Sequence, residues 1–192
     1  MPPEPRAGKL LPPTPIEPSH DVRRFDSGEP AIDDFLKRSA LRNHRERFSM
    51  VLVVADEARE VFGYHALAHG AVSRSVGLVR KERHGAPAEI PAIVLGRLGV
   101  DRRVQGRGIG RDLLRHAVET ALLIAGTTVH GTSLPFAVMA IRALDAERAA
   151  FYARHGFRSF DREHPLDLVR RIADLEADRQ LAGRMRAASE GE

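Results

Sequence analysis

The chain has 192 residues, 43% of them hydrophobic and 29% charged, so it is large enough and apolar enough to fold as one domain with a terminal extension. It contains no cysteine, which excludes disulfides, thiolate metal sites and a cysteine nucleophile. Its 30 Lys and Arg residues outnumber its 26 Asp and Glu residues, which gives a net charge of +4. This excess of positive charge is consistent with a phosphate-bearing partner and equally with an ordinary solvated surface. The longest apolar run, Met50 to Ala55, is too short to cross a membrane, and no apolar signal segment opens the chain, so we expect a cytoplasmic protein with no membrane partner.

The first 18 residues contain seven of the 12 prolines. Proline lacks an amide donor and fixes φ, so we expect a proline-rich N-terminal arm over residues 1–18, with a short strand near Thr14. The folded domain is expected over residues 19–175 and a charged C-terminal helix or tail over residues 176–192.

A helix is predicted after the turn at residues 25–30, because Asp26 or Ser27 could cap it and Pro30 suits a first helical turn. Apolar or small residues recur on one helical face, at Ile32, Phe35, Leu36, Ser39, Ala40 and Asn43. The other face is basic, and its Lys37, Arg38, Arg42 and Arg45 are candidate contacts to nucleic-acid phosphates. A solvated helix face is the alternative interpretation.

The middle of the chain is rich in β-branched residues. Strands are predicted over residues 50–55, 61–73 and 93–100, the first two as a hairpin. Residues 74–89 are expected to form a loop or an irregular helix. Gly96 and Gly99 interrupt the third strand, which predicts a bulge or a close backbone approach.

A glycine-rich turn at residues 105–110 leads directly into another predicted helix. The apolar face of this helix comprises Ile109, Leu113, Leu114, Ala117, Val118, Ala121 and Leu122, and His116 is expected at the surface. The remaining predicted elements are a linker over 126–135, a strand over 136–141, a helix over 146–155, weaker strands over 157–160 and 166–170, and a helix over 172–186. Gly156 is expected to end the second of these helices in the left-handed conformation. This order of elements favours one α/β (α+β) domain, with a single mixed sheet flanked by helices.

The glycine-rich turn carries the strongest chemical signal. A strand, the sequence Gln105-Gly106-Arg107-Gly108-Ile109-Gly110 and a helix follow one another directly. Backbone N–H groups at a helix N-terminus bind phosphate, and glycine lets the backbone approach it closely. We therefore predict a pyrophosphate site, to which the arginines at 102, 103, 107 and 111 add charge. A tight helix start is the alternative; a Walker loop is excluded because no Gly-Lys-Ser/Thr follows, and the glycine spacing does not match a Rossmann fingerprint.

Two motifs resemble those of the GCN5-related N-acetyltransferases (GNAT family). Arg97-Leu98-Gly99-Val100 with Gln105 to Gly110 looks like the family's acetyl-CoA motif, and Ala149 to Phe157, which contains Phe151-Tyr152, looks like its A-x-x-F-Y-x-x-x-G-F element. Within the family, Phe25-Asp26-Ser27-Gly28 and Ile32 to Leu36 are most similar to the acetyltransferase toxins of toxin–antitoxin pairs.

The resemblance implies roles for individual residues. The central strand would be splayed so that pantetheine lies beside it, and an N–H group there, that of Leu98, would polarise the thioester carbonyl. Tyr152 matches the general acid that protonates the leaving thiolate, with a core aromatic as the alternative. The implied cofactor-binding residues are Leu98, Gly99, Val100, Gln105, Gly106, Arg107, Gly108, Ile109, Gly110 and Arg111. No general base is visible, which favours an α-amine acceptor, because its pKa near 7.7–8.0 leaves a sizeable neutral fraction.

The sequence therefore predicts an N-acetyltransferase that uses acetyl-CoA and no metal. The resemblance to the toxins implies acetylation of the amine of aminoacyl-tRNA, a block of translation, and tRNA and a small ribbon-helix-helix antitoxin as partners. A homodimer is a further candidate partner, but the sequence does not give the oligomeric state. An acetyltransferase for a small-molecule or protein amine is the first alternative. A non-catalytic module that binds CoA or nucleic acid is the second, since fold alone does not fix function.

Overall fold

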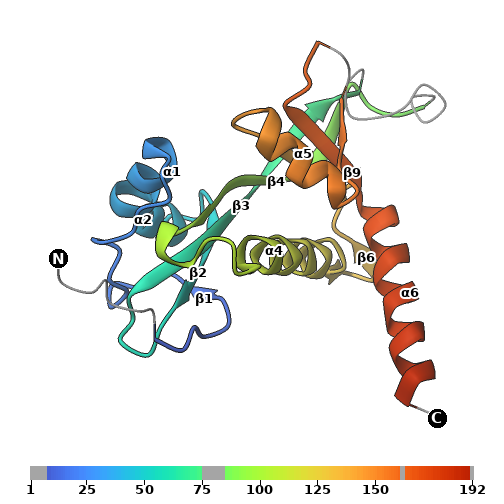
Figure 1. Cartoon of the computed structure of the whole chain (residues 1–192). Helices are drawn as coiled ribbons and strands as arrows, with labels where there is room; N and C mark the ends of the chain where they lie inside the picture. Colours follow the sequence, from blue (N-terminus) through green and yellow to red (C-terminus); the bar gives the residue numbers. More distant parts are fainter. Residues whose placement is uncertain (1–7, 75–84, 161–162, 191–192) are drawn as a thin grey trace. The chain divides into compact units, whose positions relative to one another are not determined.

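The computed structural model describes residues 8–74, 85–160 and 163–190 (Figure 1). The first seven residues of the expected arm and most of the loop expected over residues 74–89 lie outside this description. The chain divides into two compact units, Met1–Ala68 with Leu95–Ala117 and His69–Val94 with Val118–Glu192.

The strands form a seven-stranded sheet in the order β1-β2-β3-β4-β7-β9-β8 and a separate two-stranded sheet, β5-β6. The helices and strands run in the order β1 (Thr14–Pro15), α1 (Pro30–Asp34), η1 (Phe35–Ser39), α2 (Ala40–Arg45), β2 (Met50–Ala55), β3 (Val61–Ser73), β4 (Glu89–Val100), η3 (Arg102–Val104), α4 (Ile109–Ala125), β5 (Thr128–Val129), β6 (Thr132–Ser133), β7 (Val138–Arg142), α5 (Ala146–Arg154), β8 (Arg158–Ser159), β9 (Asp167–Arg171) and α6 (Ile172–Glu190). The predicted fold class, one mixed sheet flanked by helices, is confirmed. The splay expected of the central strand stays a prediction.

The first unit packs the segment α1-η1-α2 against β2 and β3. Ile32, Leu36 and Ala40 are buried with Phe25 and Tyr64 in one apolar cluster, as the helical spacing predicts. Pro30 occupies the first helical turn, but the N-cap residue is Glu29 and not Asp26 or Ser27.

The helix predicted after Pro30 is interrupted by a π-helical segment, η1. The hydroxyl of Tyr64 donates a hydrogen bond of 2.7 Å to the carbonyl of Ile32, just before this segment. A π-helical turn changes the hydrogen-bond ladder, and such turns often occur at functional sites. The π-helical segment contains Phe35, Lys37 and Arg38, so its geometry determines the direction of these three side chains.

The described part of the N-terminal arm is attached to β2. Thr14 pairs with Val53 and Pro15 with Leu52, and the amide of Leu11 donates to the carbonyl of Ala55. Proline is tolerated in an edge strand because no ladder hydrogen bond is required of it there. The strand predicted near Thr14 is confirmed.

The second unit is built around β7 and β9, which pair antiparallel from Val138↔Arg171 to Arg142↔Asp167. Its apolar cluster contains Ile90, Ala92, Val138, Ala140 and Val169. The linker predicted over residues 126–135 was wrong in part, since β5 and β6 form a hairpin there. His130 and Gly131 turn this hairpin with φ of 51° and 79°, the conformation of a tight hairpin turn that local periodicity does not reveal.

Helix α5 ends within one residue of its predicted end at residue 155, and helix α6 begins at residue 172, as predicted. The Asp145 side chain caps α5 by accepting a hydrogen bond from the amide of Arg148 (2.8 Å), and Gly156 follows the helix with φ of 81°. Helix α6 runs without a break across the expected boundary at residue 176 and reaches Glu190. None of the described helices is long and apolar enough to cross a membrane.

Candidate active site

The glycine-rich turn lies between η3 and α4 in the first unit. Gly106 and Gly108 have φ of 75° and 84°, a conformation that side chains with a Cβ rarely adopt. A Cβ on Gly106 would meet nothing within 4 Å, so the backbone of the turn faces open space. Helix α4 begins at Ile109, and the first four amides of a helix have no partner within it. The turn therefore fits the pyrophosphate site that the sequence predicted.

A buried ion pair between Asp101 and Arg103 stabilises the segment that leads into the glycine-rich turn. The Asp101 side chain is 1% exposed and accepts hydrogen bonds from the amides of Asp26 (3.1 Å) and Arg103 (2.9 Å). The guanidinium of Arg103 donates to Asp101 and to Glu60 (both 2.8 Å) and lies 4.6 Å from the centre of the Phe62 ring. The hydrogen bonds from Arg103 outweigh burial and hold the pKa of Asp101 below its usual value.

The prediction that Arg103 adds charge to the phosphate site was wrong, because this side chain is committed to Asp101 and Glu60. Arg102 stays 62% exposed with a loose contact of 3.6 Å to Asp26, and Arg107 and Arg111 are exposed. The cationic groups available at the turn are therefore Arg102, Arg107 and Arg111.

Gln105 connects the turn to a distant segment. Its side-chain amide donates to the carbonyls of Val100 (2.9 Å) and Ser27 (3.0 Å), and the amide of Arg102 donates to the carbonyl of Asp26 (2.8 Å). The segment that begins the α1 region is thereby fastened to the turn. Gln105 positions the loop through its side chain, so any contact of this residue with a cofactor would involve its backbone.

The close backbone approach predicted for the central strand is found at Gly99. A Cβ there would lie 2.6 Å from Cγ2 of Ile32 and 2.9 Å from Cε1 of Tyr64, distances that real Cβ atoms do not show. Glycine thus allows the end of β4 to contact α1. Leu98, whose N–H group is the expected carbonyl-polarising donor, and Val100 flank this contact.

Beside Leu98, the structure brings together two residues that the sequence did not pair. The guanidinium of Arg97 lies 5.4 Å from the centre of the Phe35 ring, and that ring is stacked on Tyr64 at 6.1 Å and 14°. Arg97 is exposed and Phe35 is half-buried, so both can contact a ligand. The periodicity assigned Phe35 to the core face only, and no local signal linked it to the strand.

Tyr152 lies on α5 in the second unit and is 8% exposed. Its ring contacts Phe151 and Phe157 edge-on, as a core aromatic would. Its hydroxyl, however, makes no hydrogen bond with any residue that the structure describes and is not enclosed. A buried tyrosine normally has a partner for its hydroxyl, so this unpartnered group is available to a ligand. Burial raises the pKa of Tyr152 to about 12, which keeps the phenol protonated at neutral pH.

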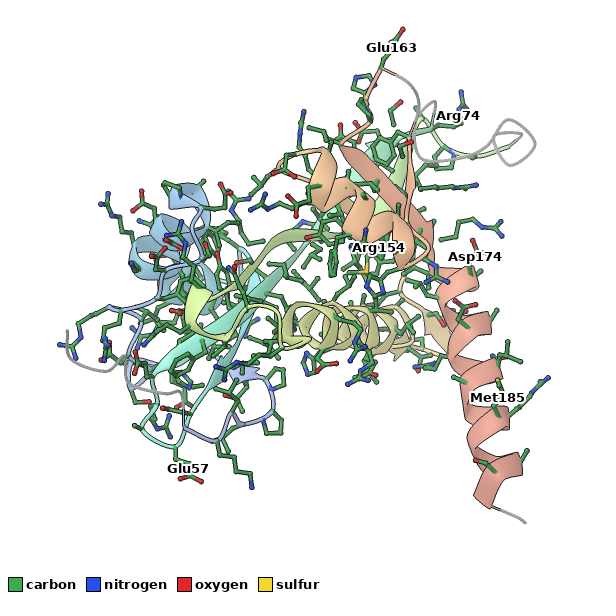
Figure 2. All side chains as sticks on the ribbon, viewed as in Figure 1. Glu57, Arg74, Arg154, Glu163, Asp174 and Met185 are labelled. Carbon is green, nitrogen blue, oxygen red and sulfur yellow. The ribbon has the colours of Figure 1, made fainter. Side chains whose placement is uncertain are left out.

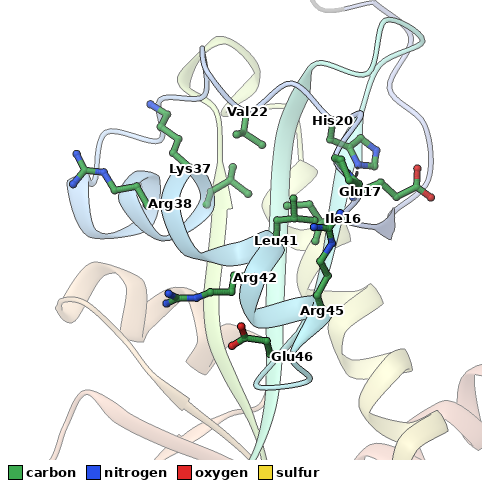
Figure 3. Close-up of a pocket in the computed structure, with 12 residues that line it drawn as sticks. Ile16, Glu17, His20, Val22, Lys37, Arg38, Leu41, Arg42, Arg45 and Glu46 are labelled. Atoms are coloured by element: carbon green, nitrogen blue, oxygen red, sulfur yellow. Dashed lines mark hydrogen bonds between the residues drawn. The ribbon is translucent and has the colours of Figure 1, made fainter.

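The four basic residues predicted to contact nucleic acid lie around one pocket of the first unit, of about 530 Å³ (Figure 3). Its apolar part comes from Ile16, Val22, Leu36 and Leu41, and its cations are Lys37, Arg38, Arg42 and Arg45. Figure 3 shows Arg45 reaching toward the segment that contains Glu17 and His20, while Arg38 and Arg42 extend from the helix on the other side.

These cations are largely uncommitted. Arg38 pairs with Asp34 at 3.3 Å on the exposed surface, which contributes little stability. Within residues 8–74, 85–160 and 163–190, Lys37, Arg42 and Arg45 form no ion pair. They are therefore free to meet phosphate groups.

The prediction that His116 lies at the surface was wrong. Its Nδ1 is 3.0 Å from Nε2 of His65, a fully buried residue of β3, and His116 is half-buried on α4. Burial, with His116 as a smaller cause, lowers the pKa of His65 to about 3. No group of three or more metal-ligating side chains occurs in the described parts of the chain.

Comparison with known proteins agrees with the two motifs. The acetyltransferase (GNAT) domain family matches residues 48–159. The chain is 36% identical over 162 residues to the tRNA-acetylating toxin of Mycobacterium tuberculosis (strain ATCC 25618 / H37Rv), a match that covers 84% of this chain and 92% of that protein.

Two similar solved structures contain ligands. One is AtaT complexed with acetyl-methionyl-tRNAfMet, with a TM-score of 0.76, 25% identity, and coverage of 88% of this chain and 98% of that one. The other is a tyrosine-to-phenylalanine mutant of the AtaT toxin bound to the C-terminus of the antitoxin AtaR and acetyl-CoA, with a TM-score of 0.69, 25% identity, and coverage of 88% and 97%. The family match spans more than half of the chain and the mycobacterial relative is more than 30% identical, so this protein belongs to the GNAT family of acetyltransferases.

Proposed function

We propose that this acetyltransferase transfers the acetyl group of acetyl-CoA to the α-amine of aminoacyl-tRNA in the cytoplasm, and that it is the toxin of a toxin–antitoxin pair. The observation that carries the proposal is the 36% identity to a tRNA-acetylating toxin over most of both chains. The AtaT structures, with acetyl-methionyl-tRNAfMet in one and antitoxin and acetyl-CoA in the other, support the same substrate, cosubstrate and type of protein partner.

The residues of the glycine turn fit the proposed cosubstrate. The backbone amides of residues 106–110, together with Arg107 and Arg111, would hold the pyrophosphate at the start of α4. When bound, acetyl-CoA supplies the acetyl group as an activated thioester. The N–H group of Leu98 would donate a hydrogen bond to the carbonyl oxygen, where negative charge develops during acyl transfer.

Tyr152 is the proposed general acid. Its hydroxyl would give its proton to the leaving sulfur, and the phenol would recover one from solvent, which receives the proton that the attacking amine loses. The hydroxyl, which has no partner among the described residues, supports this role, and its raised pKa keeps the group protonated at neutral pH. No base is required if the acceptor is an α-amine, since part of it is already neutral.

The proposed tRNA contact is the basic pocket beside α2. Lys37, Arg38, Arg42 and Arg45 would bind phosphates of the acceptor arm, which positions the RNA and carries no sequence information by itself. In the described structure three of these four cations lack an ion pair, which favours a polyanionic partner over a merely solvated face. A small ribbon-helix-helix antitoxin and a homodimer remain part of the proposal as partners.

Acetyl transfer from labelled acetyl-CoA to total charged tRNA tests the proposal. We expect label in charged tRNA, none in the same tRNA after deacylation, and release of the label as an N-acetylamino acid when the ester is hydrolysed. The rival function, acetylation of a small-molecule or protein amine, predicts unlabelled charged tRNA at low salt together with labelled polyamines or peptides. That outcome would overturn the aminoacyl-tRNA assignment.

A further inference from the structure

The end of α5 is shaped by the turn that follows Tyr152. The carbonyl of Tyr152 accepts hydrogen bonds from the amides of His155 (2.9 Å) and Phe157 (3.2 Å), and Gly156 between them has φ of 81°. Any displacement of this turn is therefore transmitted to the residue that we propose as the general acid.

Arg170 of β9 packs directly against the same turn. Its Nη1 donates a hydrogen bond of 3.0 Å to the carbonyl of His155, and a Cβ on Gly156 would lie only 2.9 Å from its Cζ. The Arg170 side chain is 18% exposed, so most of it is covered by the protein. A planar guanidinium can bind two acceptors at fixed angles, which makes it suited to hold two segments in one geometry.

The second acceptor belongs to the C-terminal helix. Nη2 of Arg170 forms a hydrogen-bonded ion pair with Oδ2 of Asp178, in the second turn of α6. A continuous series of contacts thus runs from α6 through Asp178 and Arg170 to the carbonyl of His155 and the turn behind Tyr152.

We infer that Arg170 and Asp178 are positioning residues for Tyr152, and that α6 contributes to acetyl transfer by bracing the end of α5. The inference rests on the proposed role of Tyr152 as the general acid. Without Asp178, the Arg170 guanidinium loses the acceptor that fixes its orientation, and the turn after Tyr152 loses its side-chain support. Acid catalysis depends on geometry at the level of a fraction of an ångström, so the effect should fall on kcat.

The variant Asp178→Asn tests this with a matched control. Asp174→Asn removes the neighbouring ion pair, between Asp174 in the first turn of α6 (Figure 2) and Arg171 of β9, and leaves the bonds of Arg170 to Asp178 and to the carbonyl of His155 in place. We expect Asp178→Asn to lower kcat by about tenfold with an unchanged KM for acetyl-CoA, and Asp174→Asn to stay within about twofold of the parent protein. Equal kcat values for the two variants would overturn the inference.

A double-mutant cycle separates positioning from general destabilisation. In a Tyr152→Phe background there is no hydroxyl left to position, so adding Asp178→Asn should cause no further loss of kcat. A full additional loss would show that Asp178 acts on stability alone and would overturn the inference while leaving the role of Tyr152 intact. If Tyr152→Phe by itself had no effect, both the general-acid assignment and the inference would fall.

A charge-exchange variant tests whether kcat depends on the hydrogen bond from Arg170 to the carbonyl of His155 or only on the ion pair between Arg170 and Asp178. The pair Arg170→Asp with Asp178→Arg can restore the ion pair, but an aspartate at position 170 cannot donate to the carbonyl of His155. We expect kcat of this double variant to stay about tenfold low, like that of Asp178→Asn. Recovery of the parental kcat would show that the link to His155 is not used, and would overturn the positioning role.

Discussion

The two tyrosines of the chain illustrate how environment separates a structural from a reactive side chain. Tyr64 is fully buried, its hydroxyl is bonded to the carbonyl of Ile32, and its ring contacts Phe25 and Phe35. Tyr152 is nearly as buried, yet its hydroxyl makes no hydrogen bond within the described structure. Both pKa values are raised by burial, so both phenols are protonated at neutral pH, but only Tyr152 can donate to a ligand.

The substitution Tyr152→Phe should lower kcat by about 10²–10⁴, because it removes the proton donor and keeps the packing. The affinity for acetyl-CoA, measured by calorimetry, should change little. Tyr64→Phe is the control for loss of a hydroxyl: it should reduce the unfolding free energy by about 1 kcal/mol, through loss of its hydrogen bond to the carbonyl of Ile32, and leave kcat within a few-fold of the parent value. Equal kcat values for Tyr152→Phe and the parent protein would place the acid elsewhere.

At the residue scale, the sequence indicates which residues form the site better than it indicates which side chains they contact. The glycine-rich sequence predicted a turn at residues 105–110, and Gly106 and Gly108 adopt a positive φ in it, a local property that glycine permits. It did not predict that Arg103 is held by Asp101 and Glu60, since Glu60 lies more than 40 positions away. Asp101 alone, two residues before Arg103, was a local signal for that ion pair. The contact between Arg97 and Phe35 is equally non-local.

At the scale of elements, the segment α1-η1-α2 has one face that packs in the core and another that lines the basic pocket. Its buried face, with Ile32, Leu36 and Ala40, holds it against β2 and β3, while its other face presents the cations of the pocket. The charged residues can therefore be changed without disturbing the core. This separation makes the proposed tRNA contact accessible to mutation.

Reversal of two cations, Arg42→Glu with Arg45→Glu, should weaken acetylation of charged tRNA and leave acetyl-CoA affinity unchanged. Each lost phosphate contact should lower the magnitude of the slope of log K against log salt concentration by about 0.7–0.9, hence by about 1.4–1.8 for the pair. The control is Arg179→Glu with Arg184→Glu on the exposed part of α6, which changes the net charge equally. A similar change in slope for both pairs would indicate a net-charge effect and contradict the proposed contact.

Hydrophobic periodicity predicted most helices and strands, because the spacing of apolar residues that defines an amphipathic face is a property of neighbouring positions in the sequence. The buried face of α4 and the hairpin of β2 and β3 lie where expected. The interruption by η1 was not predicted, since the buried residues Ile32, Leu36 and Ala40 keep a helical spacing across it. The hairpin of β5 and β6 is too short to show an alternating pattern.

At the scale of the whole molecule, stability should depend on pH through the buried His65. Its pKa is about 3 in the folded chain against an ordinary value of 6.5, so below pH 6.5 the unfolded chain takes up a proton that the folded chain does not. The free energy of unfolding should therefore fall as the pH drops from about 6.5 toward 3, by at most about 1.4 kcal/mol per pH unit. The lowered pKa of Asp101 adds to this loss at the acid end of the range.

Urea unfolding at pH 7.5, 6.0 and 5.0 measures this dependence. The variant His65→Leu, which has a similar volume and does not titrate, should show a flatter dependence over this range even if its stability at pH 7.5 differs. His69→Leu is the control, because His69 lies four residues further along the same strand and is exposed. Parallel curves for the parent and His65→Leu would contradict the assignment of the pH dependence to this residue.

The contrast between the two tyrosines also gives the protein a built-in optical reporter. The chain has no tryptophan, so its near-ultraviolet emission comes from Tyr64 and Tyr152 alone. The hydroxyl of Tyr64 is shielded and already bonded, whereas that of Tyr152 has no partner in the part of the chain that the structure describes. Occupation of the space beside α5 should therefore alter the emission of Tyr152 and spare that of Tyr64. The difference spectrum between the parent and Tyr152→Phe would then isolate the light emitted by a single side chain, and ligand binding could be followed without any attached dye.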